Sequence, residues 1–246
     1  TFTRQLKSMG RLFLGAGKVH IAELPSTNSF AQQLLEDRPP EGMVITTNLQ
    51  TAGRGQGGTR WMASSGQNIL MSAILYPKLA AREAFCLGQM TALAIWQCIH
   101  DLFPDDDLHI KWPNDIYLEG RKIAGILIEN QLQGSQVKSC VIGIGLNVNQ
   151  AVFPPDSGKP TSLFLHSGQH WDRDEVLEKL LDKLEVNYLR LRQHGAASFR
   201  RDFEARMLGF RQKLSLSFDE STQDCLILGT DSKGHLRVET PDGTER

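Results

Sequence analysis

The sequence predicts an α+β fold: a mixed sheet with helices over residues 1–210, followed by a small β module over residues 211–246. Two observations predict this division. Up to about residue 210, segments with strand alternation and segments with helical periodicity follow one another in no regular order. Beyond that point only short strands separated by turn residues remain. A chain of 246 residues suits one large domain with a small appendage.

The first half of the chain predicts three strands and two helices. Residues 18–24 and 43–47 are rich in strand-forming residues, and the continuous apolar run at 68–76 is typical of a central strand. Residues 26–37 and 81–102 carry apolar side chains at helical spacing. The strand at 43–47 leads into a glycine-rich stretch.

A meander of strands is predicted next. Residues 108–112 form a strand that ends in a Pro-Asn-Asp turn. Residues 116–132 read as a hairpin-like pair bent at Glu119-Gly120, and residues 137–149 predict a further long strand.

The last part predicts two helices and the β module. Asp172 followed by Glu175 is typical of a helix start, and leucines at helical spacing continue it to Leu191. A shorter helix is expected to end at Gly209. The module then has three predicted strands, at residues 213–218, 225–230 and 235–240. Because no closing strand is visible, the module is expected to be small or truncated.

Composition indicates which kinds of partner and which cellular compartment to expect. The net charge of −1 predicts no general attraction to nucleic acid, so no specific DNA partner is expected. No apolar run approaches the roughly 18–20 residues that span a bilayer. The four cysteines form no CxxC pair and no short disulfide framework, which predicts reduced, buried thiols in a cytoplasmic protein.

Several chemistries have no support in the sequence. There is no GxSxG elbow and no HExxH pair, the seven histidines show no ligand spacing, and no paired carboxylates stand out. Acyl hydrolysis, metalloprotease chemistry and glycoside hydrolysis are therefore not indicated. Metal ligands are not identified either.

The stretch QTAGRGQGGTRW, residues 50–61, is the first candidate site. Its glycines match the dinucleotide fingerprint, but a strand follows in place of the helix that the fingerprint requires, and no P-loop ending is present. It is either a mobile surface turn or an anion-binding loop. Arg54 and Arg60 favour the second, because arginine adds a planar donor fork for phosphate or carboxylate.

The motif KWPND, residues 111–115, places a lysine at a strand end. Alternation puts Ile110 and Trp112 on one face and Lys111 on the other. A lone lysine in this setting is most often an ordinary surface side chain over apolar neighbours. The alternative is a site residue, since sites in α/β proteins are often built at strand ends.

The motif GIGLN, residues 143–147, leaves one strand face bare of side chains. Gly143 and Gly145 share this face, and Asn147 ends it; Gly125 extends it if its strand lies alongside. Such a face is either a close backbone contact or a slot for a flat ligand, and the amide of Asn147 could pair with an adenine edge.

Residues 26–28, Ser-Thr-Asn, open the first helix. Ser26 or Thr27 is a natural N-cap, which is a sufficient explanation by itself. The N-terminus of a helix can also receive a polar head group.

These motifs together resemble the biotin–protein ligases, over roughly residues 18–246. The resemblance implies a catalytic domain similar to class II aminoacyl-tRNA synthetases and lipoate ligases, with a small SH3-like C-terminal module. It implies that biotin and ATP form biotinyl-5′-AMP, and that biotin passes to a lysine of a biotin carboxyl carrier domain. Nothing before the first strand suggests a DNA-binding domain, so the short, non-repressor type is expected.

The resemblance also assigns roles to residues. Lys111 and Arg54 would be catalytic, with Mg²⁺ accompanying ATP. Residues implied in biotin binding are Ser26, Thr27, Asn28, Gln50, Arg54, Gly55, Gln56, Lys111, Gly125 and Gly143. Residues implied in ATP or adenylate binding are Arg54, Arg60, Lys111, Gly145 and Asn147. The family loop often reads GRGRRG, whereas Gln56 and Gly57 stand here, so Arg60 is a candidate for the missing charge.

Two alternatives remain open. One is a lipoate or octanoate ligase or transferase of related fold, whose fatty chain would not need the polar Ser-Thr-Asn and Gln50 groups. The other is a non-catalytic nucleotide-binding regulatory module. The oligomeric state is expected to be monomer or homodimer.

Overall fold

A seven-stranded mixed sheet forms the centre of the computed structural model, which describes residues 11–218 and 221–246. The strand order is β1-β2-β3-β7-β6-β5-β4. Strands β1 and β2 are parallel, and every other neighbouring pair in this sheet is antiparallel. The predicted mixed sheet is therefore confirmed. The strands are β1 (Lys18–Leu24), β2 (Val44–Gln50), β3 (Ile69–Leu75), β4 (Leu108–Lys111), β5 (Asp115–Leu118), β6 (Arg121–Gln133) and β7 (Gln136–Leu146).

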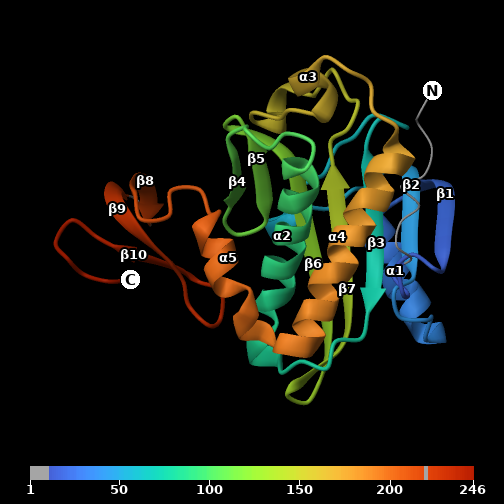
Figure 1. Ribbon diagram of the computed structural model, residues 1–246, viewed down its shortest axis with the longest axis horizontal. Coiled ribbons are helices and arrows are strands. Elements are labelled where there is room, and N and C mark those ends of the chain that lie inside the picture. Colours follow the sequence, from blue (N-terminus) through green and yellow to red (C-terminus); the bar gives the residue numbers. More distant parts are fainter. Residues whose placement is uncertain (1–10, 219–220) are drawn as a thin grey trace.

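Helices cover both faces of this sheet. Two long helices, α2 (Phe85–His100) and α4 (Arg173–His194), pack on one face, in front of the strands in Figure 1. The short helix α1 (Thr27–Leu34) packs against β2, β3 and β7 on the other face. Two short helices complete the main body, α3 (Leu163–Ser167) and α5 (Arg200–Ala205).

The two faces follow from strand alternation. On β7, Ile142, Ile144 and Leu146 share one face, as strand alternation predicts, and belong to the large apolar core under α2 and α4. Gly143 and Gly145 therefore face the α1 side. The cavity described below is lined by these two glycines, so the glycine face is also the site face.

Some element boundaries differ from the sequence prediction. The first helix ends at Leu34 and continues as a 3-10 turn, and the second begins at Phe85 after a 3-10 turn. The second strand continues to Gln50, so it delivers that side chain to the site. The last helix ends at Ala205, not at Gly209.

A three-stranded antiparallel sheet forms the C-terminal module, which projects to one side of the molecule in Figure 1. Its strands are β8 (Lys213–Phe218), β9 (Ser221–Thr230) and β10 (Leu236–Glu239). The final residues also pair with this sheet, since Val238 and Arg246 exchange two backbone hydrogen bonds of 2.8 Å. Cys225, Ile227 and Val238 belong to the same apolar core as the main body, so the two sheets share one core.

The four cysteines are free and buried, as predicted. Burial raises the pKa of Cys86 and of Cys98 to about 12, so both stay protonated thiols at neutral pH. Among the described residues, no helix is long and apolar enough to cross a bilayer.

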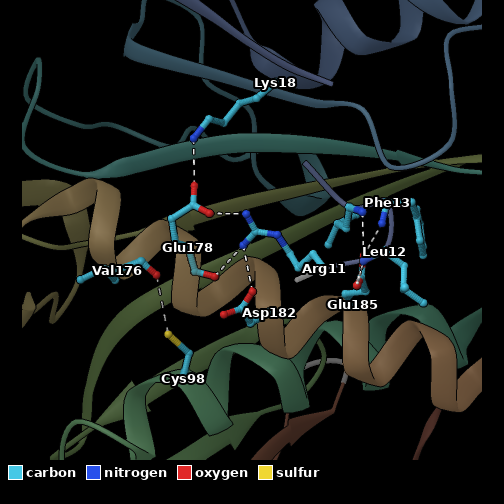
Figure 2. Close-up of polar contacts among 10 residues, drawn as sticks. Arg11, Leu12, Phe13, Lys18, Cys98, Val176, Glu178, Asp182 and Glu185 are labelled. Carbon is cyan, nitrogen blue, oxygen red and sulfur yellow. Dashed lines mark hydrogen bonds and ion pairs between the residues drawn. The ribbon is translucent and has the colours of Figure 1, made fainter. Parts of the chain in front are cut away.

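The segment before β1 is tied to α4 by charged groups (Figure 2). Glu185 is 4% exposed and accepts the backbone N–H groups of Leu12, Phe13 and Leu14 at 2.5, 2.9 and 2.7 Å. About two turns away on α4, Glu178 accepts from Arg11 and from Lys18. Burial raises the pKa of Glu178, but the hydrogen bonds and positive charges of Arg11 and Lys18 lower it by a larger amount. The net shift of this pKa is therefore downward.

We expect Glu185→Ala to destabilise the protein by about 1–3 kcal/mol, because backbone donors would lose their acceptor in a buried place. Urea unfolding followed by tryptophan fluorescence measures this. Val186→Ala is the matched control, since Val186 is next in the helix and 64% exposed. Equal midpoints for the two variants would show that Glu185 does not hold this segment.

Candidate functional site

A cavity of about 420 Å³ lies on the α1 side of the sheet, beneath the glycine loop (residues 51–61). It collects eleven of the residues that the sequence singled out, from α1, β2, the loop, β6 and β7. These are Ser26, Thr27, Asn28, Gln50, Arg54, Gly55, Gln56, Arg60, Gly125, Gly143 and Gly145. Motifs far apart in the chain therefore converge on one site.

The floor of the cavity is a hydrogen-bonded polar network. Gln50 Oε1 accepts from the backbone N–H of Thr27 at 2.8 Å and from its hydroxyl at 3.1 Å. The Ser72 hydroxyl lies 2.6 Å from Asn28 Oδ1 and 2.8 Å from Thr27 Oγ1. Because Asn28 Oδ1 can only accept, Ser72 donates to it. The network presents neutral donors and acceptors, which suits a polar, uncharged group of a ligand.

Ser26 has the structural role that its position predicted. It is the N-cap of α1, and its side chain accepts from the Ser29 backbone N–H at 3.4 Å. Ser72 was missed by the sequence reading, because an isolated serine in an apolar strand carries no motif. Its pairing with Gly143 in the sheet register brings it to the site.

The glycine at 143 is required by a close contact with α1. A Cβ atom placed there would lie 2.2 Å from Asn28 Oδ1, which is closer than any real Cβ contact. Close packing of a helix on this glycine and a role of this glycine in the site are therefore compatible. The helix approaches the strand so that Asn28 can reach the floor of the cavity.

The other two glycines of this face are covered by Trp61, which ends the glycine loop. A Cβ at Gly145 would lie 2.3 Å from the indole, and one at Gly125 would lie 2.8 Å from it. The bare strand face is therefore filled by a flat aromatic side chain of the protein itself, and a slot for a flat ligand stays a prediction. Trp61 was not predicted, although an aromatic residue directly after a glycine-rich loop is a usable signal. Its Nε1 is buried without a hydrogen-bond partner.

The lysine at the cavity is Lys122, and Lys111 is not brought to it. Lys122 lines the cavity, its Nζ lies 2.7 Å from Asp115 Oδ1, and it sits over the Trp61 ring at 5.5 Å. Lys111 lies on the edge strand β4 and contacts the Tyr117 hydroxyl at 3.2 Å. It lines a separate apolar cavity of about 450 Å³ beside the C-terminal module.

A β-bulge explains why the sequence reading missed Lys122. Simple alternation from Gly125 would place Ile123 at the cavity and Lys122 in the core. The β5–β6 register shifts between Ile116 and Tyr117, so Ile123 is fully buried and Lys122 lies on the cavity side. A lysine at a predicted core position is itself a signal for such a bulge.

Asn147 lies in an adjoining cavity of about 320 Å³. The two cavities share five lining residues, which are Thr59, Arg60, Trp61, Asp115 and Lys122. Asn147 Nδ2 donates to the Thr161 carbonyl at 2.9 Å, and its Oδ1 is buried without a partner. The site thus has two compartments with Lys122 and Trp61 between them.

Among the described residues, no group of three or more His, Cys, Asp or Glu side chains could hold a metal ion. Asp115 is the carboxylate common to both compartments.

Comparison with known proteins agrees with this geometry. A family model described as the biotin/lipoate A/B protein ligase family matches residues 21–147. The bifunctional ligase/repressor BirA of Bacillus spizizenii is 34% identical over 236 residues, covering 95% of this chain and 72% of that protein. The biotin–[acetyl-CoA-carboxylase] ligase of Paracoccus denitrificans is 30% identical over 233 residues, covering 92% and 95%.

A solved structure gives the same result at the level of the fold. The biotin protein ligase from Aquifex aeolicus, in complex with biotin and ATP, has a TM-score of 0.77 and 26% identity, covering 94% of this chain and 95% of that chain. The match includes both the mixed sheet and most of the C-terminal module. With the family model, the curated relatives and the fold in agreement, this chain belongs to the biotin/lipoate A/B protein ligase family.

Proposed function

We propose that the protein is an ATP-dependent biotin–protein ligase. It joins biotin to ATP to give biotinyl-5′-AMP and pyrophosphate, and then transfers biotin to a lysine of a biotin carboxyl carrier domain. The observation that carries the proposal is the two-compartment site, with a neutral polar floor in one compartment and Lys122 between the two.

The polar floor selects among the acids that this family uses. The ureido ring of biotin needs donors and acceptors, and Thr27, Asn28 and Gln50, which line the cavity, can supply them. A lipoyl or octanoyl chain has no donor or acceptor along its length, so it gains no hydrogen bond from these groups, whereas the ureido ring does. This supports biotin over the fatty acyl alternative.

The charged groups suit adenylation. A carboxylate oxygen of biotin attacks the α-phosphorus, pyrophosphate leaves, and a carboxyl–phosphate anhydride forms. Lys122 and Arg60 are the cationic side chains shared by both compartments, so they can stabilise the negative charge that gathers where the two substrates meet. In the second step the amine of the acceptor lysine attacks the acyl carbon, and AMP leaves.

The adenine is assigned to the second compartment. The free Oδ1 of Asn147 can accept from an adenine amino group there. Trp61 lies at the boundary and can contact the flat base once its indole shifts from the glycine face.

Mg²⁺ is expected to enter with ATP. Magnesium keeps several waters and is often bound through one or two carboxylates and substrate phosphates, so a dedicated cluster of protein ligands is not needed. Asp115 is the carboxylate that fits this role.

The proposal is tested by pyrophosphate release from the purified chain with ATP and biotin, lipoate or octanoate. Release with biotin alone supports the biotin ligase, and release with lipoate or octanoate supports the acyl alternative. Absence of release with all three, together with ATP binding, would support the non-catalytic nucleotide-binding module.

Further expectations concern the setting. The four buried thiols fit a reducing cytoplasm, and the oligomeric state is expected to be monomer or homodimer. No sequence-specific DNA binding is expected. A gel shift with duplex DNA over a range of salt concentrations tests this, because salt-tolerant, sequence-dependent retardation would contradict it.

We expect Thr27→Val to lower biotin affinity by about 1–3 kcal/mol, because valine keeps the shape and removes the hydroxyl that pairs with Gln50. Isothermal titration calorimetry measures the affinity. If only the melting temperature falls, Thr27 serves the start of α1 and not the ligand.

A further inference from the structure

The glycine loop is held as one unit by its own backbone. Gly55 N–H donates to the Thr59 carbonyl at 2.7 Å, and Trp61 N–H donates to the Gly53 carbonyl at 3.1 Å. A group that holds one end of such a unit therefore restrains all of it. Trp61 is one end, seated on the glycine face, and Arg54 is the other.

Arg54 is held by Glu129, a residue of β6 to which the proposed function assigns no role. Nη1 of Arg54 lies 3.0 Å from Oε1 of Glu129, and Nη2 lies 2.8 Å from Oε2. This is the bidentate geometry that gives arginine–carboxylate pairs their directionality. The side chains are 43% and 28% exposed, so the pair is partly screened by solvent.

Glu129 also reaches the floor of the cavity. Its Oε2 accepts from Asn28 Nδ2 at 2.8 Å, and Asn28 Oδ1 accepts from Ser72. A continuous chain of polar contacts thus runs from the polar floor through Glu129 to the glycine loop. A ligand that engages Asn28 acts directly on the group that holds Arg54.

The pair lies away from the proposed reacting groups. Lys122 and Glu129 are seven residues apart on β6, so their Cα atoms are about 23 Å apart at roughly 3.3 Å per residue. The Arg54 guanidinium is drawn toward the Glu129 end, and its charge is already paired there. Its position fits a role in closing the loop better than a role in neutralising phosphate.

We infer that Glu129 is a positioning residue. It holds the glycine loop closed over the cavity through Arg54, and Asn28 couples that closure to occupancy of the polar floor. We call the Arg54–Glu129 ion pair the latch. The identity of the molecule under the loop rests on the proposed function, whereas the latch itself does not.

Hydrogen exchange of the amides of residues 55–61, in the ligand-free protein, tests the latch. Glu129→Gln keeps an acceptor for Asn28 and removes the charge that Arg54 needs, and Arg54→Gln removes the other partner. Each is expected to raise exchange about fivefold, the scale of a favourable exposed pair. Glu23→Gln, at an exposed glutamate of β1, is the charge-matched control and should leave exchange unchanged.

The decisive variant exchanges the partners, Arg54→Glu with Glu129→Arg. Asn28 keeps its second acceptor, the Leu127 carbonyl at 3.2 Å, so the reversed pair can form. Exchange is expected to return to within about twofold of the parent. The inference would be overturned if amide exchange in the double variant were as fast as in the single variants. It would also be overturned if exchange in the single variants were no faster than in the parent.

A second readout separates the latch from the chemistry. With biotin and ATP, Glu129→Gln should change single-turnover pyrophosphate release by less than about twofold, while labelling of a bystander protein rises about fivefold, as the loop opens more often. A loss of pyrophosphate release as large as the loss expected on removing a reacting group would contradict a positioning role for Glu129. If the parent releases no pyrophosphate while the exchange results hold, the proposed function fails and the latch stands.

Discussion

Lys122→Gln is expected to slow adenylate formation by about 100- to 1,000-fold, the cost of removing one donor to a developing anion. Lys122 is the lysine that lines both compartments, and its charge is needed most as negative charge gathers at the α-phosphate. Single-turnover pyrophosphate release measures the rate. Biotin affinity should fall much less, because ground-state binding relies on the polar floor.

Lys111→Gln is the matched control for this experiment. Lys111 is exposed, contacts Tyr117, and lines the separate apolar cavity beside the C-terminal module. Its loss should change the rate by less than about threefold. The opposite outcome, a slow Lys111 variant and a normal Lys122 variant, would restore the assignment made from the sequence and reject the one made from the structure.

Gly143→Ala is expected to weaken biotin binding by about 10- to 100-fold. The added methyl group would lie 2.2 Å from Asn28 Oδ1, and Asn28 is held in place by Ser72 and by the Leu127 carbonyl. Its displacement breaks buried hydrogen bonds of about 1–3 kcal/mol each. Overpacking should also cost about 1–3 kcal/mol of stability.

Titration calorimetry and urea unfolding separate the two effects. The control is Gly88→Ala in α2, where an added Cβ meets nothing within 4 Å. This change should leave biotin affinity unchanged and favour the helix slightly. If Gly143→Ala keeps parental affinity, Asn28 does not contact the ligand.

Local patterns in the sequence singled out many of the residues that the structure brings to one cavity. Alternation along residues 143–147 separated a glycine face from an apolar face, and the structure confirms both. The cap at Ser26 and the polar residues after it were also predicted, and they lie at the cavity. These features depend on neighbours within a few residues, so the sequence is enough to predict them.

Features set by distant contacts were not predictable in this way. Lys122 faces the cavity because a bulge between β5 and β6 changes the side to which it points, and the bulge arises from pairing of two strands. Glu129 meets Arg54 across 75 positions of the chain. The predicted boundary at residue 210 stays a prediction, because one core extends under both sheets.

The sequence by itself therefore determined the mixed α+β fold, the faces of its strands and the chemical character of the site: glycines, amides, hydroxyls and cations. Only the tertiary structure decided which lysine reaches the cavity, which aromatic side chain covers the glycine face, and which carboxylate holds the loop. The reason is physical. Alternation and capping are short-range consequences of backbone geometry, whereas strand register, a bulge and a side-chain pair between distant segments exist only once the whole sheet has assembled.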